Sequence, residues 1–338
     1  MNSILVTGGA GYIGSHTLVC LLEKGENVVV VDNFDNSCPE ALERVKKLTG
    51  KDFPFYEFDV CDEGNLIDAI KLHHVDCVIH FAGLKAVGES VKMPLKYYSN
   101  NLMSTISLLS AMEKTNVNQL IFSSSATVYS AENTVPLREG GRLGCSNPYG
   151  WTKFMNEQII RDAAVARPEL TAVLLRYFNP VGAHESGLIG EDPSGIPNNL
   201  MPYICQTAVG RRDHLTVFGN DYDTHDGTGV RDYLHVMDLA EGHVCAVDYA
   251  RKNSGITEIN LGTGTGYSVL DMVNAFERAT GAKVPYEIGP RRPGDLATVY
   301  SDPEKAHRLL GWEAKRTIED MCRDGWKWQS MNPNGYRK

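Results

Sequence analysis

A tyrosine and a lysine stand four residues apart, at Tyr149 and Lys153, near the start of a predicted helix. On a helix this separation places both side chains on one face, one turn apart. A phenol with a pKa of about 10 is a poor base at neutral pH, but a nearby ammonium group favours the phenolate. Tyr149 is therefore a candidate general base, although such a pair also occurs often by chance.

A serine that could assist this base is Ser125, which follows a predicted strand at residues 120–123. Ligands of open parallel sheets bind at the carboxyl ends of the strands, so Ser125 could hydrogen-bond a substrate hydroxyl there. The alternative is a serine that only opens a turn of the loop.

Three glycines, Gly8, Gly11 and Gly14, lie between a predicted strand and a predicted helix near the N-terminus. Their spacing differs from the three-glycine pattern of medium-chain dehydrogenases only in its first gap. Such glycines allow a tight turn, let the backbone approach a pyrophosphate, and bring the helix close to the strand. The positive end of the helix then faces the phosphates, so this segment predicts a dinucleotide site.

Two carboxylates extend this prediction to the adenosine half of the dinucleotide. Asp32 stands eighteen residues after Gly14, at the end of the second predicted strand. It can accept hydrogen bonds from both ribose hydroxyls and repel a 2′-phosphate, which favours NAD over NADP. Asp59 follows the third predicted strand and is placed to meet the adenine amino group, although alone it is better explained as a helix cap. The glycines, Asp32, the serine, the tyrosine and the lysine together are difficult to attribute to chance.

The elements that must position these residues alternate along the first half of the chain. We predict strands at residues 3–7, 27–31, 53–58, 77–81, 120–123 and 172–176, and helices at residues 14–24, 39–49, 64–72, 94–114 and 149–165. Short apolar strands separated by helices favour a parallel sheet with right-handed crossovers. The predicted fold is therefore α/β, with a Rossmann-type doubly wound parallel sheet.

The second half differs in composition, because residues 180–202 are rich in proline and glycine. After this stretch we predict helices at 202–209, 236–250, 268–280 and 317–330, and strands at 215–218, 258–260 and 284–288. We therefore expect an NAD-binding domain at residues 1–178, which carries the catalytic residues. A smaller α/β substrate lobe follows at residues 179–338, with a possible crossover of the chain between the two.

Composition excludes several other classes of protein. The chain has 338 residues and a net charge of −9, which argues against binding to nucleic acid or to an anionic membrane. Its apolar runs are far shorter than a membrane span, and its N-terminus lacks a secretion signal, so we expect a cytoplasmic protein. Eight cysteines without a CxxC pair predict reduced thiols rather than disulfides, and we expect no metal site.

Four stretches carry a family resemblance: HFAGLKAVGES at residues 80–90, YFNPVGAH at 177–184, GIPNNLMPY at 195–203 and GTGVRDY at 227–233. Together with the motifs above, they make the chain resemble the UDP-glucose 4-epimerase (UDP-galactose 4-epimerase) family of the extended short-chain dehydrogenase/reductase superfamily. The resemblance runs from Met1 to about Gly335. It implies NAD as a permanently bound cofactor and a UDP-sugar as substrate.

The resemblance also implies which positions contact each ligand. NAD would be contacted by Gly8, Gly11, Tyr12, Ile13, Gly14, Asp32, Asn33, Asp59, Val60, Phe81, Ala82, Gly83, Lys85, Asn100, Ser123, Tyr149, Lys153 and Phe178. The UDP-sugar would be contacted by Lys85, Ser125, Tyr149, Phe178, Asn179, Asn199, Leu200, Phe218, Arg231, Arg292, Asp295 and Val299. Arginine pairs suit a diphosphate, which agrees with Arg231 and Arg292.

The reaction that the resemblance implies is the interconversion of UDP-glucose and UDP-galactose, a step of galactose metabolism. It inverts C4 through a transient 4-keto sugar and enzyme-bound NADH, with Tyr149, Ser125 and Lys153 as catalytic residues. The family commonly has Tyr or Cys where this chain has Val299, so we expect room for UDP-N-acetylglucosamine and UDP-N-acetylgalactosamine as well. It also implies a homodimer, for which the helices at 94–114 and 149–165 carry apolar residues, although a core-facing side would look the same in sequence.

Three other functions stay open. A sugar-nucleotide dehydratase shares the fold and the tyrosine–lysine pair, but it needs an acid and a base beside the serine, where this chain has Ala126 and Thr127. A dehydrogenase would release NADH instead of retaining it. A non-catalytic NAD sensor would have no need for Ser125, Tyr149 and Lys153 together.

Overall fold

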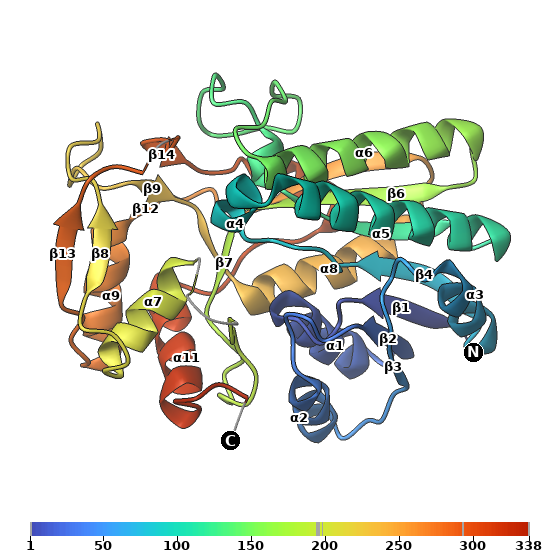
Figure 1. The fold of residues 1–338 in the computed structure, drawn as a ribbon, viewed down its shortest axis with the longest axis horizontal. Helices are drawn as coiled ribbons and strands as arrows, with labels where there is room; N and C mark the ends of the chain where they lie inside the picture. Colours follow the sequence, from blue (N-terminus) through green and yellow to red (C-terminus); the bar gives the residue numbers. More distant parts are fainter. Residues whose placement is uncertain (1, 194–196, 198, 293, 337–338) are drawn as a thin grey trace.

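A seven-stranded parallel sheet forms the centre of the computed structural model, which describes residues 2–193, 197, 199–292 and 294–336 (Figure 1). From one edge to the other its strands are β11 (Ile256–Leu261), β6 (Thr171–Tyr177), β5 (Gln119–Ser125), β4 (Val75–His80), β1 (Ser3–Thr7), β2 (Val28–Asp32) and β3 (Phe55–Glu57). The chain steps outward from β1 to β3, returns to β4 and steps outward again. This is the order of a doubly wound sheet, and the predicted Rossmann-type fold is confirmed.

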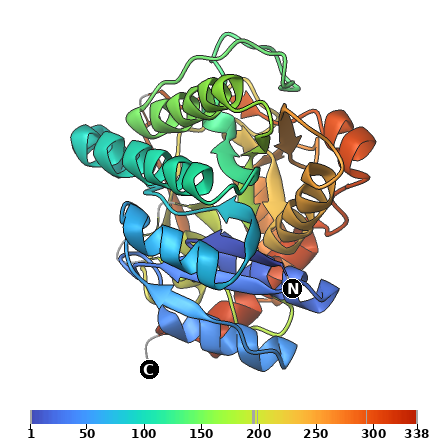
Figure 2. The same ribbon diagram turned by 90° about the vertical axis from the view of Figure 1, so that its right-hand side faces the viewer.

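Helices cover both faces of the sheet, as the two views show (Figures 1 and 2). One face is covered by α1 (Tyr12–Lys24), α2 (Pro39–Thr49) and α8 (Val236–Ala250), and the other by α3 (Glu63–Leu72), α5 (Pro94–Lys114) and α6 (Pro148–Ala166). Strands between two helical layers have no solvent-facing side, which explains why all five residues of β2 are buried. Along β2, Val28 and Val30 enter the first core, while Val29 and Val31 enter the second.

One part of the predicted organisation is wrong: the strand at residues 258–260 does not belong to the second lobe. It is the centre of β11, which pairs in parallel with β6 at the edge of the main sheet. The helix α8, which precedes it, packs on α1, so the chain returns to the first lobe after leaving it at the end of β6. A short apolar strand suits either sheet, so its pattern does not reveal its partner.

The second lobe is built from α7 (Leu200–Ala208), α9 (Val269–Thr280) and α11 (Ile318–Met331), which share one core. Its small sheets pair β8 (Leu215–Phe218) with β13 (Tyr286–Gly289), β7 (Asn179–Val181) with β10 (Tyr233–His235), and β9 (Val230–Arg231) with β12 (Tyr267–Ser268) and β14 (Thr298–Val299). The shorter helices are α4 (Val87–Lys92), the 3-10 turn η1 (Ala126–Val128) and α10 (Glu304–Leu310). Within the residues described, no helix is both long and apolar enough to cross a membrane.

Three histidines are almost fully buried in the first lobe, and they make stability depend on pH. Burial lowers the pKa of His16 and His80 to about 3 and that of His243 to about 4. The unfolded chain has these groups near pKa 6.5, so below that pH unfolding takes up protons and the free energy of unfolding falls. We expect a loss of about 1.4 kcal/mol per histidine for each pH unit below 6.5.

Denaturant unfolding at pH 7 and pH 5.5 measures this loss. Carboxylates with ordinary pKa values stay ionised across this range, so the histidines dominate the change. A free energy of unfolding that is the same at both pH values would contradict the prediction.

Candidate active site

The predicted glycine turn lies at the point where β1 and β4 diverge, as dinucleotide sites do in doubly wound sheets. Gly8 has a φ of 70°, and a Cβ on it would lie 2.8 Å from the backbone nitrogen of Ala82. A Cβ on Gly14 would collide with the carbonyl oxygen of Gly8. Gly11 is the N-cap of α1. The turn is therefore packed against the backbone that follows β4, in a form that only glycine permits and that fits a pyrophosphate cradle.

Asp32 lies at the end of β2, buried, and holds this turn in place. Its Oδ2 accepts a hydrogen bond from the Ala10 nitrogen at 3.0 Å, and its Oδ1 accepts from Ser37 Oγ at 2.7 Å and the Phe34 nitrogen at 3.0 Å. A carboxylate offers about four acceptor positions. A double contact with ribose hydroxyls therefore requires at least one of these bonds to be exchanged.

Asp59 lies close to Asn33, so two predicted cofactor residues meet beside β2 and β3. Asn33 Nδ2 donates to Asp59 Oδ2 at 3.2 Å, and the Cys61 nitrogen donates to Asp59 Oδ1 at 2.8 Å. Partial burial raises the pKa of Asp59, but hydrogen bonds from Cys61 and Asn33 outweigh it and hold this pKa below its usual value. The carboxylate therefore stays an acceptor at neutral pH.

A glutamate that the sequence did not single out, Glu191, joins the two sides of the site. Its Oε1 accepts from Lys85 Nζ at 3.0 Å and from Asn199 Nδ2 at 2.8 Å. The same Lys85 Nζ lies 5.8 Å from the centre of the Tyr12 ring. One predicted cofactor residue and one predicted substrate residue thus share a single carboxylate, which lies in a proline-rich and glycine-rich stretch without periodicity.

Tyr149, Lys153 and Ser125 come together at the end of β5. Asn147 caps α6 by accepting from the Gly150 nitrogen at 2.9 Å, which places Tyr149 in the first turn of the helix. Ser125 lies close enough to the Tyr149 phenol to lower its pKa. Lys153 Nζ donates to the Ser123 carbonyl oxygen at 2.7 Å and lies 5.9 Å from the centre of the Tyr149 ring.

Burial works against charge on both catalytic candidates. It raises the pKa of Tyr149 to about 12, although the hydrogen bond with Ser125 opposes this. It lowers the pKa of Lys153 to about 8, so the ammonium form still prevails at pH 7. In the chain by itself the phenol is therefore protonated at neutral pH, and a further positive charge close to Tyr149 is needed to produce the phenolate.

A buried ion pair lies directly behind these residues. Arg176 and Glu157 are each 1% exposed, and the guanidinium donates from Nη2 at 2.6 Å and from Nε at 2.9 Å. Ser124 Oγ also donates to the glutamate, at 2.6 Å. The pair thus joins α6, which carries Tyr149, to β5 and β6, and its members could not be matched from the sequence pattern.

On the second lobe, four predicted substrate residues converge. Arg292 Nε lies 2.8 Å from Asp295 Oδ2, and Arg231 Nη2 lies 3.8 Å from Asp295 Oδ1. The Arg292 guanidinium also lies 5.0 Å from the centre of the Phe218 ring. Two arginines and an aromatic ring at one place suit a nucleoside diphosphate.

The remaining predicted residues lie around these groups. Phe178 and Val299 share a small apolar cluster with Val128, Tyr129 and Leu137. Asn179 begins β7, Leu200 begins α7, and Val60 is buried after β3. Ile13 packs against the core of the first lobe, and the centres of the Phe81 and His243 rings are 4.7 Å apart. Gly83 faces Asn101, and Asn100 donates a hydrogen bond to the Asn101 side chain. Gly195, Ile196 and Asn198 of the motif at 195–203 lie outside the described residues.

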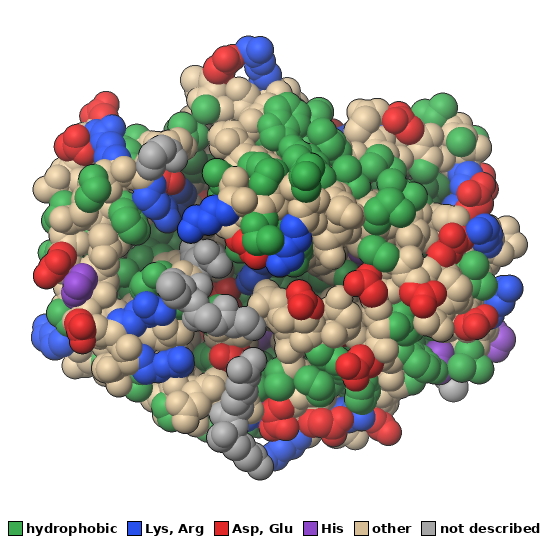
Figure 3. Space-filling view, viewed as in Figure 1, with side chains coloured by type: hydrophobic (Ala, Val, Ile, Leu, Met, Phe, Trp, Pro, Cys, Tyr) green, Lys and Arg blue, Asp and Glu red, His purple; other side chains and the backbone are tan. Residues whose placement is uncertain are grey.

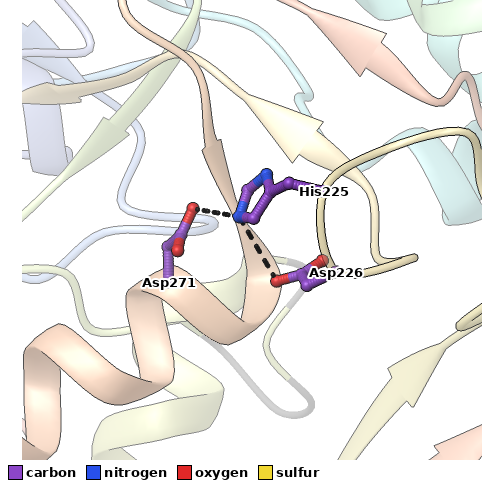
Figure 4. A group of neighbouring side chains, drawn as sticks. All are labelled: His225, Asp226 and Asp271. Carbon is purple, nitrogen blue, oxygen red and sulfur yellow. Dashed lines mark ion pairs between the residues drawn. The ribbon is translucent and has the colours of Figure 1, made fainter.

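His225, Asp226 and Asp271 form the one group among the described residues with the side chains and spacing to hold a metal ion (Figure 4). His225 Nε2 lies 3.1 Å from Asp271 Oδ2 and 3.7 Å from Asp226 Oδ2. Both carboxylates already serve local structure, because Asp271 closes the capping box of α9 and Asp226 accepts from Thr228 and Ser268. The group anchors the loop before β9 to α9.

Comparison with known proteins identifies a matching family model and close relatives. Residues 5–325 match the family model described as GDP-mannose 4,6 dehydratase. The chain is 61% identical over 335 residues to a UDP-glucose 4-epimerase of Bacillus subtilis (strain 168), with 99% of each chain covered.

Solved structures that resemble the chain are also UDP-glucose 4-epimerases. A UDP-glucose 4-epimerase from Bifidobacterium longum in complex with NAD+ and UDP is 55% identical, with a TM-score of 0.95 over 99% of this chain and 100% of that chain. A UDP-glucose-4-epimerase from Stenotrophomonas maltophila with bound NAD and formylated UDP-arabinopyranose is 48% identical, with a TM-score of 0.97 over 98% and 99%.

Proposed function

Because the chain belongs to the UDP-glucose 4-epimerase family of the extended short-chain dehydrogenases and reductases, we propose that it interconverts UDP-glucose and UDP-galactose. The observation that carries the proposal is the meeting of Ser125, Tyr149 and Lys153 at the same edge of the main sheet as the glycine turn. Residues 1–178 would hold NAD, and residues 179–338 would hold most of the UDP-sugar.

The residues divide the work as follows. Bound NAD supplies a hydride acceptor for C4 of the hexose and then a donor to its opposite face. Tyr149 Oη takes the proton of the 4-hydroxyl and later returns it, while Ser125 holds that hydroxyl in line. The Lys153 ammonium favours the phenolate of Tyr149. No electron is gained or lost overall, so one cofactor serves every turnover.

Inversion requires the 4-keto sugar to present both faces to the same tyrosine. The hexose must therefore turn while the diphosphate stays held. Arg231 and Arg292 suit this role, because they lie together on the second lobe and arginine pairs bind phosphate oxygens well.

Incubating the purified protein with UDP-galactose, without added NAD, tests the proposal. UDP-glucose is the expected product, and its absence would refute the main proposal. Release of NADH would favour a dehydrogenase. A 4-keto-6-deoxy sugar would favour a dehydratase, for which Ala126 and Thr127 provide neither the acid nor the base.

We further propose that N-acetylated UDP-hexoses are substrates, because Val299 is much smaller than tyrosine. It lies half-buried on β14, against the cluster that contains Phe178. We expect Val299→Tyr to abolish conversion of UDP-N-acetylgalactosamine and to preserve conversion of UDP-galactose, because the larger ring fills the space of the acetamido group. Product separation with each substrate measures this, and Val299→Cys, a change of small volume, should keep both activities. Equal loss of both activities in Val299→Tyr would contradict the proposal.

A homodimer through α5 and α6 is a further proposal. Large apolar side chains are exposed on and beside these helices, including Leu95, Met103 and Ile106 on α5 and Met155 on α6. Figure 3 shows hydrophobic side chains gathered on this face of the molecule. Pairing α5 and α6 with those of a second copy would bury them in a four-helix interface.

We expect Ile106→Glu to convert the dimer to a monomer, because two buried carboxylates would face each other across the interface. Sedimentation velocity measures the change. Leu72→Glu, which places the same charge at an exposed position of α3, should leave the dimer intact. A wild-type monomer would rule out the proposed interface.

We also propose a cytoplasmic location. All eight cysteines lie within the described residues, and each is free. Free thiols in this number suit a reducing compartment.

A further inference from the structure

Asp232 is a completely buried carboxylate in the second lobe, directly after Arg231. Five hydrogen bonds converge on its side chain. Thr263 donates to Oδ1 from its nitrogen at 2.8 Å and from Oγ1 at 2.6 Å. Ser301 donates to Oδ2 from its nitrogen at 3.1 Å and from Oγ at 2.6 Å, and the Gly264 nitrogen donates at 3.2 Å.

The backbone of Asp232 joins two further segments. Its nitrogen donates to the Val299 carbonyl oxygen at 3.0 Å, and its carbonyl oxygen accepts from the Asn179 nitrogen at 3.0 Å. One residue therefore connects β7, β9 and β14 to the loop at 262–264. Three predicted substrate residues, Asn179, Arg231 and Val299, lie on these strands.

The atoms around the Asp232 carboxylate are closely packed. A Cβ on Gly262 would collide with both Asp232 Oδ2 and Ser301 Oγ, so the loop approaches as closely as glycine allows. A dry carboxylate is costly unless its hydrogen bonds are made, so displacement of any donor is strongly resisted. The segment that follows Val299 is thereby held in a fixed position relative to Arg231.

We infer that Asp232 is a positioning residue for the UDP-sugar, an inference that rests on the proposed function. It sets the separation between Arg231, which would hold the diphosphate, and Val299, which would face the hexose. Asp232 itself touches neither ligand. Its loss should therefore change how well the substrate fits, more than how fast the bound substrate reacts.

The test compares Asp232→Asn and Ser301→Ala with the control Thr207→Ala. Asparagine directs an NH2 group against N–H or O–H donors. Ser301→Ala removes, two residues after Val299, the hydroxyl that donates to Asp232 and accepts from the Gly264 nitrogen. Thr207 is also buried in the second lobe, but its hydroxyl donates only to the Tyr203 carbonyl oxygen, at 2.8 Å. Each alanine variant loses a buried hydroxyl, so both should have a lower melting temperature, and only a role in positioning the substrate should separate their KM values.

The KM for UDP-galactose should rise about tenfold in Asp232→Asn and about threefold in Ser301→Ala. These increases correspond to the loss of one hydrogen bond to a charged group in the first variant and of part of one in the second. It should stay constant in Thr207→Ala. In all three variants kcat and the content of bound NAD should stay close to wild type. If Asp232→Asn does not fold, the Ser301→Ala and Thr207→Ala pair still decides the question.

Two results would overturn the inference: a lower melting temperature in Asp232→Asn with an unchanged KM, or equal changes of KM in Ser301→Ala and Thr207→Ala. Failure of the proposed function is seen separately, because the wild type would then not convert UDP-galactose at all. In that case the dissociation constant of UDP, measured by calorimetry in the same variants, takes the place of KM.

Discussion

Replacing Tyr149 with phenylalanine is expected to lower kcat about a thousandfold while NAD stays bound. A positioned general base contributes about 10²- to 10⁴-fold to a rate, and the change removes the phenol that lies beside Ser125. The ring remains, so the packing beside Lys153 is preserved. The cofactor should be retained, because the glycine turn and Asp32 would hold it from the other end.

Steady-state turnover and the nucleotide released on denaturation measure the two halves of this prediction. Tyr249→Phe is a matched control, because the hydroxyl of this tyrosine on α8 makes one long hydrogen bond, of 3.4 Å, with Thr257. Its activity should equal that of the wild type. A Tyr149→Phe enzyme with full turnover would remove Tyr149 from the mechanism, and one without NAD would assign it to cofactor binding.

The second large effect is expected from Glu157→Gln, which should lower the free energy of unfolding by about 3–5 kcal/mol. The amide keeps the shape of the side chain but leaves the buried Arg176 guanidinium without a counter-charge. Burial lowers the pKa of Arg176, but its hydrogen bonds with Glu157 outweigh this and hold the pKa above its usual value. In the variant this support is lost, but a guanidinium stays protonated in proteins, so the arginine remains charged and uncompensated.

Denaturant unfolding measures this loss. Glu258→Gln is the matched control, because this glutamate pairs with Arg161 at 3.3 Å in a half-exposed position. Such pairs contribute about 0–1 kcal/mol, so this variant should be close to wild type. Equal small losses in both variants would show that the protein tolerates the unpaired guanidinium.

Local signals in the sequence predicted much of the fold. The bounds of α2, α5 and α8 agree with the prediction to the residue, and a proline at the N-terminal end fixes the first two. The glycine turn was also predicted, because backbone atoms approach so closely there that only glycine, which lacks a Cβ, fits. By contrast, β7, β9, β10, β12 and β14 have two or three residues each, too few for a period.

The parts that were not predicted depend on partners far apart in the chain. Glu157 and Arg176 are nineteen residues apart, and Asp232 and Ser301 are sixty-nine apart. Each of these charged or polar residues, alone, resembles an ordinary surface residue. Only the folded structure shows that each of these residues is buried and which residue it contacts.

The place of β11 has a consequence for how the chain is made. During synthesis β6 is complete at Tyr177, but its outer edge stays open until β11 leaves the ribosome about eighty residues later. An open edge of this kind invites pairing with other chains. The nascent protein thus carries an unfinished sheet while about half of residues 179–338 is translated, and residues 1–178 alone would keep an unpaired strand edge.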